Sequence, residues 1–224
     1  MVPPSLTHQP KVIVCDVDKT LTAANTWFSL TTALGGDIEK HFQIYNAYFN
    51  EKISTEDMKK GLFEMWEKGH HSKIHRDELE DILFKIPLRG EAFSTFAELR
   101  DKGYTLCLIS SSIDIFVKMV AQRLQLDHWY ANSEFIFDDK GYWIDFKYDR
   151  DEAGLKLRQI REFLRKQGVS DDECLILGDG SSEIKLFENY PGIAVDSENE
   201  TIKKLAWQEI KYLPTVLQLL QEIS

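Results

Sequence analysis

Two aspartates, Asp16 and Asp18, follow an apolar run that begins at Val12 and ends at Cys15. Such a run is typical of a strand that is buried on both faces of a parallel sheet. Burying a carboxylate there is costly without a cation or hydrogen-bond donors, so we expect Asp16 at the strand's carboxyl end, facing a site. Residues two apart leave a strand on the same side, and the main-chain carbonyl of Asp18 or the hydroxyl of Thr20 could join the two carboxylates as oxygen ligands for Mg²⁺.

A simpler interpretation of this segment is a strand followed by an Asx-type turn, in which Asp16 and Asp18 only cap and solubilise the chain. The rest of the sequence bears on this choice. Ser110, Ser111 and Ser112 follow the apolar run over residues 104–109, just before a predicted helix. A hydroxyl and free amides at the end of a strand form a geometry that binds an anion.

Gly178, Asp179 and Gly180 follow a further apolar run, and Glu183 falls in the first turn of the next predicted helix. The two glycines permit a tight loop that carries these carboxylates. A nucleotide-binding glycine loop would need a third glycine at the position of Glu183, so we discount it. Lys156 stands near the start of another predicted helix, where a lysine is usually solvated.

The elements that would hold these residues alternate between apolar runs and amphipathic segments beyond residue 90, as in a parallel sheet covered by helices. Strands are predicted at 12–16, 104–110, 174–177 and 192–195, and helices at 91–102, 114–124, 155–167, 198–207 and 214–223. Residues 133–146 predict a β-hairpin around the Asp138 to Gly141 turn. The predicted fold class is α/β, with a Rossmann-like sheet.

Residues 23–88 predict an all-helical insert of about four helices between the first two strands. Apolar residues recur there at helical spacing, among them Trp27, Leu30 and Leu34. Most of its aromatic residues are expected to form the insert's own small core. Trp27, Phe28 and Trp66 fit that core or the wall of a substrate pocket equally well.

Composition restricts the function. The chain has 224 residues, a formal net charge of −10 and 43% hydrophobic residues, without an apolar run long enough for a membrane span. This charge argues against nucleic acid and anionic membranes as partners. Cys15, Cys107 and Cys174 are widely spaced in apolar runs, as expected for reduced thiols in a cytoplasmic protein. Residues 1–10 lack the features of a secretory signal and are expected to form a loose arm.

Taken in order, the motifs resemble those of the haloacid dehalogenase superfamily of phosphatases, in the branch similar to phosphoserine phosphatase. Asp16 to Thr20 match the nucleophile motif, Ser110 the second, Lys156 the third, and Gly178 to Glu183 the acidic fourth. The resemblance covers the chain beyond residue 10. It implies a core formed by residues 11–22 and 89–224, and a helical cap formed by residues 23–88.

The resemblance implies a phosphomonoester hydrolase that acts on a small phosphorylated metabolite. Asp16 would form an aspartyl phosphate, and Asp18 would act as general acid and base. Ser110, Ser111 and Lys156 would bind the phosphoryl oxygens, with Lys156 also stabilising charge in the transition state. The cofactor would be Mg²⁺, and its predicted ligands are Asp16, Asp18, Asp179 and Glu183.

Several positions depart from the family pattern. Glu183 stands where aspartate is common, and Ser111 and Ser112 replace glycines. The acidic residue that pairs with the substrate's amino group in phosphoserine phosphatases corresponds to Asn25, which is neutral. We therefore expect a substrate other than phosphoserine, in a pocket that includes Asn25, Trp27 and Phe28.

Two other functions remain open. A weakened relative would bind a phosphorylated ligand or metal without turnover, as Glu183 and the altered serine loop suggest. A phosphate-accepting receiver domain also combines acidic residues, a hydroxyl and a lysine, but it lacks a helical insert. His70, His71 and His75 cluster in a polar connector, where a solvated loop is expected in place of a metal site.

Overall fold

The computed structural model describes residues 4–223. A seven-stranded sheet has the order β4-β3-β2-β1-β5-β6-β7. Its strands are β1 (Val12–Cys15), β2 (Thr105–Ile113), β3 (His128–Phe137), β4 (Trp143–Lys147), β5 (Cys174–Gly178), β6 (Gly192–Val195) and β7 (Gln208–Ile210). All neighbouring strands are parallel except β3 and β4, which form the predicted hairpin. The α/β fold class is thus confirmed.

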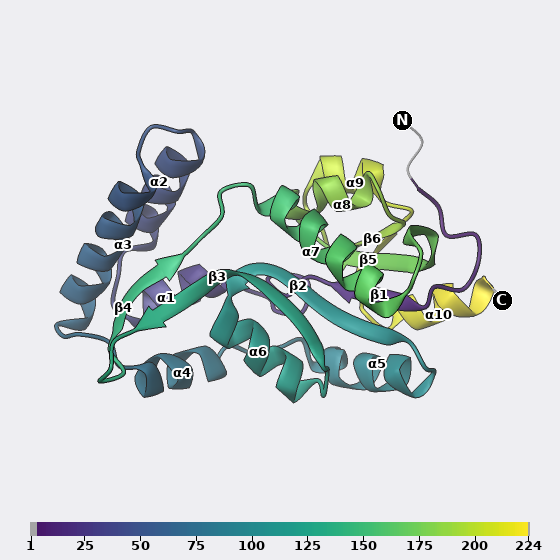
Figure 1. Cartoon of the computed structure of the whole chain (residues 1–224), viewed down its shortest axis with the longest axis horizontal. Coiled ribbons are helices and arrows are strands. Elements are labelled where there is room, and N and C mark those ends of the chain that lie inside the picture. The colour runs from purple at the N-terminus through teal and green to yellow at the C-terminus, as the bar shows by residue number, and fades with distance from the viewer. Residues whose placement is uncertain (1–3, 224) are drawn as a thin grey trace.

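Helices cover both faces of the sheet (Figure 1). Their bounds are α1 (Thr26–Ala33), α2 (Ile38–Phe49), α3 (Thr55–His70), α4 (Arg76–Phe84), α5 (Gly90–Asp101), α6 (Asp114–Arg123), α7 (Glu152–Gln167), α8 (Ile184–Phe187), α9 (Glu200–Leu205) and α10 (Thr215–Glu222). Short 3₁₀ helices span Asp171–Glu173 and Ser181–Glu183. Helices α5 and α6 pack on one face of the sheet, and α7 and α9 on the other.

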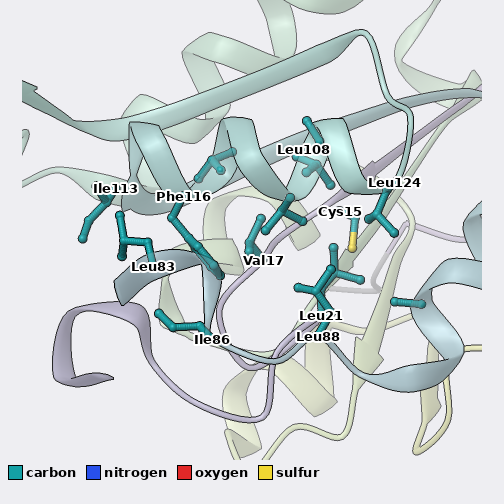
Figure 2. Packing of buried hydrophobic residues seen from close by; sticks show 14 of the residues in the cluster. Cys15, Val17, Leu21, Leu83, Ile86, Leu88, Leu108, Ile113, Phe116 and Leu124 are labelled. Carbon is teal, nitrogen blue, oxygen red and sulfur yellow. The ribbon is translucent and has the colours of Figure 1, made fainter. Parts of the chain in front are cut away.

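The central strand β1 sends alternate side chains into two cores, as the period of two along a strand requires. Ile13 and Cys15 join the larger cluster, on the side of α6, whereas Val12 and Val14 join the cluster beneath α7. Figure 2 shows Cys15 among Leu108, Leu124 and other apolar side chains. Cys15 therefore points into the core, and the alternation turns Asp16 toward α7.

Two strand predictions were incomplete. The hairpin strand β3 begins at His128, before the predicted start at residue 133, and its first half pairs in parallel with β2. Strand β7 was missed, because residues 208–210 are too few to show a periodicity and are polar at two positions. The preceding helix α9 ends at Leu205, where residue 207 was expected.

The predicted helical insert contains α1, α2, α3 and α4. The expectation that its aromatic residues form a core of their own was wrong in one respect. The rings of Trp66 and Phe63 lie 5.0 and 4.7 Å from that of Trp143 on β4, and Trp27 lies 5.3 Å from Phe146. The hairpin extends past the rest of the sheet toward α3, so its apolar face needs this cover (Figure 1).

Within the insert, α1 and α3 approach each other closely at glycines. A Cβ atom on Gly69 would lie 2.5 Å from the backbone of Gly35, and Gly35 itself has a positive φ of 67°. Side chains at these positions would force the helices apart. This contact fixes the end of α1 against α3 and so positions the helices that stand over the carboxyl end of β1.

The described part of the N-terminal arm, residues 4–10, has no helix or strand, but it is less loose than expected. Leu6 is buried in the larger core, and the hydroxyl of Tyr104 donates a hydrogen bond of 2.6 Å to Gln9 Oε1. Residues 1–3 of the predicted arm lie outside the described residues. Among residues 4–223, no helix combines the length and apolar character needed to cross a bilayer.

Candidate active site

Asp16 and Lys156 meet in the interior, although 140 positions separate them. Lys156 Nζ lies 2.7 Å from Asp16 Oδ1 and 3.0 Å from Ser182 Oγ, and it contacts the carboxylate of Glu183. The side chain of Lys156 is only 1% exposed. Burial favours the neutral amine, but the charges of Asp16 and Glu183 outweigh it and raise the pKa of Lys156. The expectation of an ordinary solvated lysine is therefore excluded.

Glu183, the last residue of the fourth motif, is fixed by two contacts, one to each carboxylate oxygen. One carboxylate oxygen accepts a hydrogen bond of 3.0 Å from Gly180 N, and the other contacts Lys156. Gly178 leaves the necessary space, because a Cβ atom there would lie 2.4 Å from Glu183 Cγ. The longer side chain of Glu183 is thus folded back against β5 and reaches the lysine.

Three carboxylates form the candidate metal site. One oxygen each from Asp16, Asp179 and Glu183 lies within 4.8 Å of the others. Thr20 Oγ1 donates a hydrogen bond of 3.0 Å to Asp179 Oδ1. Burial, and then the charge of Glu183, raises the pKa of Asp179 to about 6. Burial also raises the pKa of Asp16, although Lys156 opposes this shift. One ammonium among three carboxylates leaves an excess of negative charge and hard oxygen donors, which fits Mg²⁺.

Asp18, the second aspartate of the motif, has its carboxylate outside this cluster. Thr26 N donates a hydrogen bond of 3.0 Å to Asp18 Oδ2, and the hydroxyl of Thr26 donates to Oδ1. Burial raises the pKa of Asp18 to about 6, and the hydrogen bonds from Thr26 limit the rise. The first residue of α1 therefore orients this carboxyl group. Because both carboxylate oxygens accept hydrogen bonds from Thr26, the expected metal ligand from Asp18 is its main-chain carbonyl and not its side chain.

Ser110, Ser111 and Ser112 lie within the last part of β2, which ends at Ile113 and not at the predicted residue 110. The register with β3 shifts between Ser110 and Ile113. The backbone N–H of Ser112 donates a hydrogen bond of 3.3 Å to the Ser110 hydroxyl. Among the described residues, the buried hydroxyls of Ser111 and Ser112 have no well-formed hydrogen bond. They lie close enough to Glu152 and Asp18, respectively, to oppose part of the rise in pKa that burial causes in those groups. Polar groups of this kind can accommodate phosphoryl oxygens.

These groups open into a cavity of about 260 Å³. Its floor comes from Asp16, Asp18, Lys19, Ser110, Ser111, Ser112, Glu152, Asp179, Gly180, Ser181, Ser182 and Glu183. Its roof comes from Asn25, Trp27, Phe28, His41, Phe42, Tyr45, Tyr48, Phe49, Met58 and Leu62, together with Phe146 and Tyr148 from the hairpin and the chain that follows it. We use the names floor and roof for these two sets below.

The three aromatic residues singled out in the sequence separate in the structure. Trp27 and Phe28 line the cavity, whereas Trp66 is fully buried and donates a hydrogen bond of 2.8 Å to Thr31 Oγ1. Asn25 also faces the cavity, but its Oδ1 accepts a hydrogen bond of 3.2 Å from Phe28 N and so caps α1. A charged partner for a substrate amine does not come from this position.

Sequence reasoning missed most of the roof. Phe42, Tyr45 and Phe49 fit the spacing of an ordinary buried helix face, yet Phe42 is 51% exposed. Tyr148 and Glu152 gave no signal, because they lie in the connection to α7 and in its first turn. An indirect signal was available, because a helix with several large aromatic residues can expose an apolar patch, and such patches often mark ligand-binding grooves.

The histidines of the connector do not form a metal site among the described residues. His70 Nε2 lies 2.6 Å from Glu78 Oε1, and His75 Nε2 lies 3.0 Å from the carbonyl oxygen of Lys140. His71 ends α3 with a positive φ of 63°. These three histidines thus stabilise the connection between α3, α4 and the hairpin, His70 and His75 through their side chains and His71 through its backbone.

Comparison with known proteins decides the family. The model of the haloacid dehalogenase-like hydrolases matches residues 13–188, which contain all four motifs. The chain belongs to this family. It is 26% identical over 186 residues to a phosphoserine phosphatase of Methanocaldococcus jannaschii, a match that covers 80% of this chain and 81% of the relative. The expected enzyme class, a phosphatase of this family, is therefore confirmed.

Solved structures share the fold. A family hydrolase from Salmonella enterica serovar Typhi superimposes with a TM-score of 0.80 at 18% identity, covering 98% of this chain and 74% of that one. A phosphoserine phosphatase solved as a phospho-aspartyl intermediate analogue superimposes with a TM-score of 0.72 at 20% identity, covering 94% and 99%. At these identities the similarity establishes the fold of the chain.

Proposed function

We propose that this phosphatase hydrolyses a small phosphomonoester through an aspartyl phosphate on Asp16, with Mg²⁺ as cofactor. The observation that carries the proposal is the cluster of Asp16, Asp179 and Glu183, in which the buried ammonium group of Lys156 contacts Asp16 and Glu183. Such a cluster combines a carboxylate nucleophile with cation-binding groups. The core is formed by residues 11–22 and 89–224, and residues 23–88 act as the cap that covers the site.

In the first step, an oxygen of Asp16 attacks phosphorus, and the bond from phosphorus to the ester oxygen breaks. Asp18 gives its proton to the departing alkoxide, so that the alcohol leaves neutral. Thr26 holds both oxygens of Asp18 and so orients the proton donor. The products of this step are the free alcohol and the phosphorylated side chain of Asp16.

In the second step, Asp18 takes a proton from a water molecule, whose oxygen then attacks the same phosphorus. The bond between phosphorus and the Asp16 oxygen breaks, which returns the carboxylate and releases inorganic phosphate. Ser110, Ser111 and Lys156 hold the phosphoryl oxygens through both steps. Water reaches the intermediate only within the cavity, because the roof covers it.

The metal ligands in this proposal are Asp16, Asp179, the main-chain carbonyl of Asp18, and Glu183 directly or through water. When bound, Mg²⁺ neutralises the repulsion between the Asp16 carboxylate and a phosphate dianion. Lys156 contributes a second positive charge, with its Nζ 2.7 Å from Asp16 Oδ1. The contact with Glu183 holds the ammonium group of Lys156 beside the carboxylates when substrate is absent.

Phosphoserine is not the substrate in this proposal. Asn25 is neutral and its side-chain oxygen caps α1, so it cannot form an ion pair with an amino group. The curated relative from Methanocaldococcus jannaschii carries the name phosphoserine phosphatase, but the chains share only 26% identity. A different leaving alcohol in the same phosphate site accounts for both facts.

The test is phosphate release from a panel of phosphorylated metabolites and p-nitrophenyl phosphate, with Mg²⁺ or with a chelator. We expect release that requires Mg²⁺, with phosphoserine among the poor substrates. A chelator-resistant rate equal to the Mg²⁺ rate would contradict the proposal. Binding of Mg²⁺ without any release would instead select the weakened relative, which the pairing of Glu183 with Lys156 would then explain.

A further inference from the structure

The roof of the cavity is a group of aromatic rings centred on Tyr148. The ring centroid of Tyr148 lies 6.3 Å from Trp27, 6.2 Å from Tyr48 and 6.4 Å from Phe49. Tyr45 adds a fifth ring, 4.3 Å from Phe49. All five side chains line the cavity. The three contacts of Tyr148 are edge-to-face, with interplanar angles of 82°, 63° and 86°. A ring in such a group attracts a cation to its face through the negative charge of its π system.

A carboxylate lies at the edge of this group. Glu152, the first residue of α7, lines the cavity and accepts a hydrogen bond from the hydroxyl of Tyr148. No lysine, arginine or histidine among residues 4–223 forms an ion pair with Glu152. Burial raises the pKa of Glu152, although the hydrogen bond from Tyr148 and the charge of Lys156 oppose this shift.

Two cations contact rings of the roof without lining the cavity: Arg150 lies 4.1 Å from the Tyr48 ring centroid and Lys59 lies 5.5 Å from that of Phe146. Lys19 is the one lysine or arginine that lines the cavity within the described chain, and it belongs to the floor beside Asp18. His41 also lines the cavity, but burial lowers the pKa of His41 to about 4, so the ring is neutral at physiological pH. A negatively charged group on the substrate would therefore face rings and Glu152 without a partner.

We infer that the leaving alcohol of the substrate carries a small alkylated ammonium group and no carboxylate, with the ammonium between the aromatic rings and Glu152. This inference rests on the proposed function for the phosphate end of the site. A methylated ammonium places positive charge on a surface that is otherwise apolar, which suits aromatic faces better than a strongly hydrated amine does. Glu152 supplies the counter-charge inside the cavity.

Two other leaving groups fit less well. An amino acid alcohol brings a carboxylate, which would lose its hydration without gaining an ion pair in the roof. An uncharged aryl group would fill the space between the rings but leave Glu152 buried without a cation. The cation accounts for the rings and the carboxylate together.

The experiment compares phosphocholine with 3,3-dimethylbutyl phosphate, its uncharged carbon isostere. The two esters have the same shape, so the ratio of their kcat/KM values isolates the charge. We expect phosphocholine to be favoured by about tenfold or more. Equal values, or a preference for the isostere or for phenyl phosphate, would overturn the inference.

Binding supplies a readout that does not depend on turnover. Calorimetric titration of both esters into the Asp16→Asn protein should give a dissociation constant that is about tenfold lower for phosphocholine. If neither ester nor p-nitrophenyl phosphate is hydrolysed, the proposed function fails, and this titration still decides the inference. Equal dissociation constants for the two esters would refute it.

A variant tests the role of Glu152. Glu152→Gln keeps the shape and the acceptor for Tyr148 but removes the charge, so the phosphocholine preference should fall at least about fivefold. Glu162→Gln on the same helix is the matched control, because Glu162 is exposed and pairs with Lys166. A preference that stays intact in Glu152→Gln, or falls equally in both variants, would contradict the assigned ammonium site.

Discussion

The floor and the roof of the cavity are built on different principles. The floor brings together charged groups that follow β1 and β5 and one from α7: Asp16, Glu183 and Lys156 are in contact and each is nearly inaccessible to solvent. The roof consists mainly of rings from α1 and α2, some of them half exposed, such as Phe42. In the proposed function, the chemistry therefore depends on buried charges that stabilise one another, whereas selectivity depends on rings that could be exchanged without disturbing those charges.

The largest effect is expected from removing the nucleophile of the floor. Asp16→Asn should reduce phosphate release at least about 10³-fold for every substrate, because the covalent step is lost. Steady-state assays across the panel measure it, and thermal unfolding checks that the variant folds. A loss confined to some substrates would break the distinction between floor and roof.

The lysine of the floor should affect both activity and stability. Lys156→Met leaves Asp16 and Glu183 buried without their cation, so we expect the metal-free protein to lose about 3 kcal/mol of unfolding free energy. The rate should fall about 10²-fold. Urea unfolding with and without Mg²⁺ measures the stability, and Mg²⁺ should restore part of it.

The control for this variant is Lys166→Met, which changes an exposed lysine near the end of α7 that pairs with Glu162. Its stability should change by less than about 1 kcal/mol. If the two variants had the same unfolding free energy, Lys156 would not be needed to stabilise the buried carboxylates of Asp16 and Glu183.

Thr26 is the point at which roof and floor join, since it begins α1 and holds the carboxyl group of Asp18. Thr26→Val removes the hydroxyl but keeps the shape and the backbone N–H. We expect kcat to fall about tenfold with KM nearly unchanged. Thr32→Val is the control, because that hydroxyl donates only to Phe28 O, at 2.9 Å. A change in KM alone would show that Thr26 acts on binding.

The smallest effect is expected at the roof. Phe42→Ala should reduce kcat/KM for the preferred substrate about fivefold. Its stability should change by no more than about 1 kcal/mol, since the ring is half exposed. Phe84→Ala is matched to it, as Phe84 is 63% exposed and lies outside the cavity. Equal kinetics for the two variants would remove Phe42 from the substrate pocket.

The same contrast explains what could be predicted from the sequence. Asp16, Lys156 and Asp179 stand at recognisable positions in ordered motifs, because the ends of parallel strands meet at one edge of a sheet. The anchoring of Asp18 by Thr26 could not be predicted, since it depends on how α1 turns back over the strand end. Nor could the pairing of Glu183 with Lys156, which depends on the space at Gly178.

The roof was harder to predict for a different reason. Phe42 and Tyr45 have the spacing of a buried helix face, and nothing local distinguishes a face that packs on protein from one that packs on substrate. Tyr148 lies outside regular structure, where no period exists. The hairpin itself was predicted, but its cover by Trp27 and Trp66 depends on contacts between distant segments.

The stereochemical course at phosphorus tests the central claim, that Asp16 forms a covalent intermediate, most directly. A phosphomonoester made chiral at phosphorus with oxygen isotopes and sulfur would be hydrolysed in isotopically labelled water, and the configuration of the product determined. Two successive in-line displacements, first by Asp16 and then by water, predict net retention of configuration. Net inversion would mean a single direct attack by water and would contradict the account.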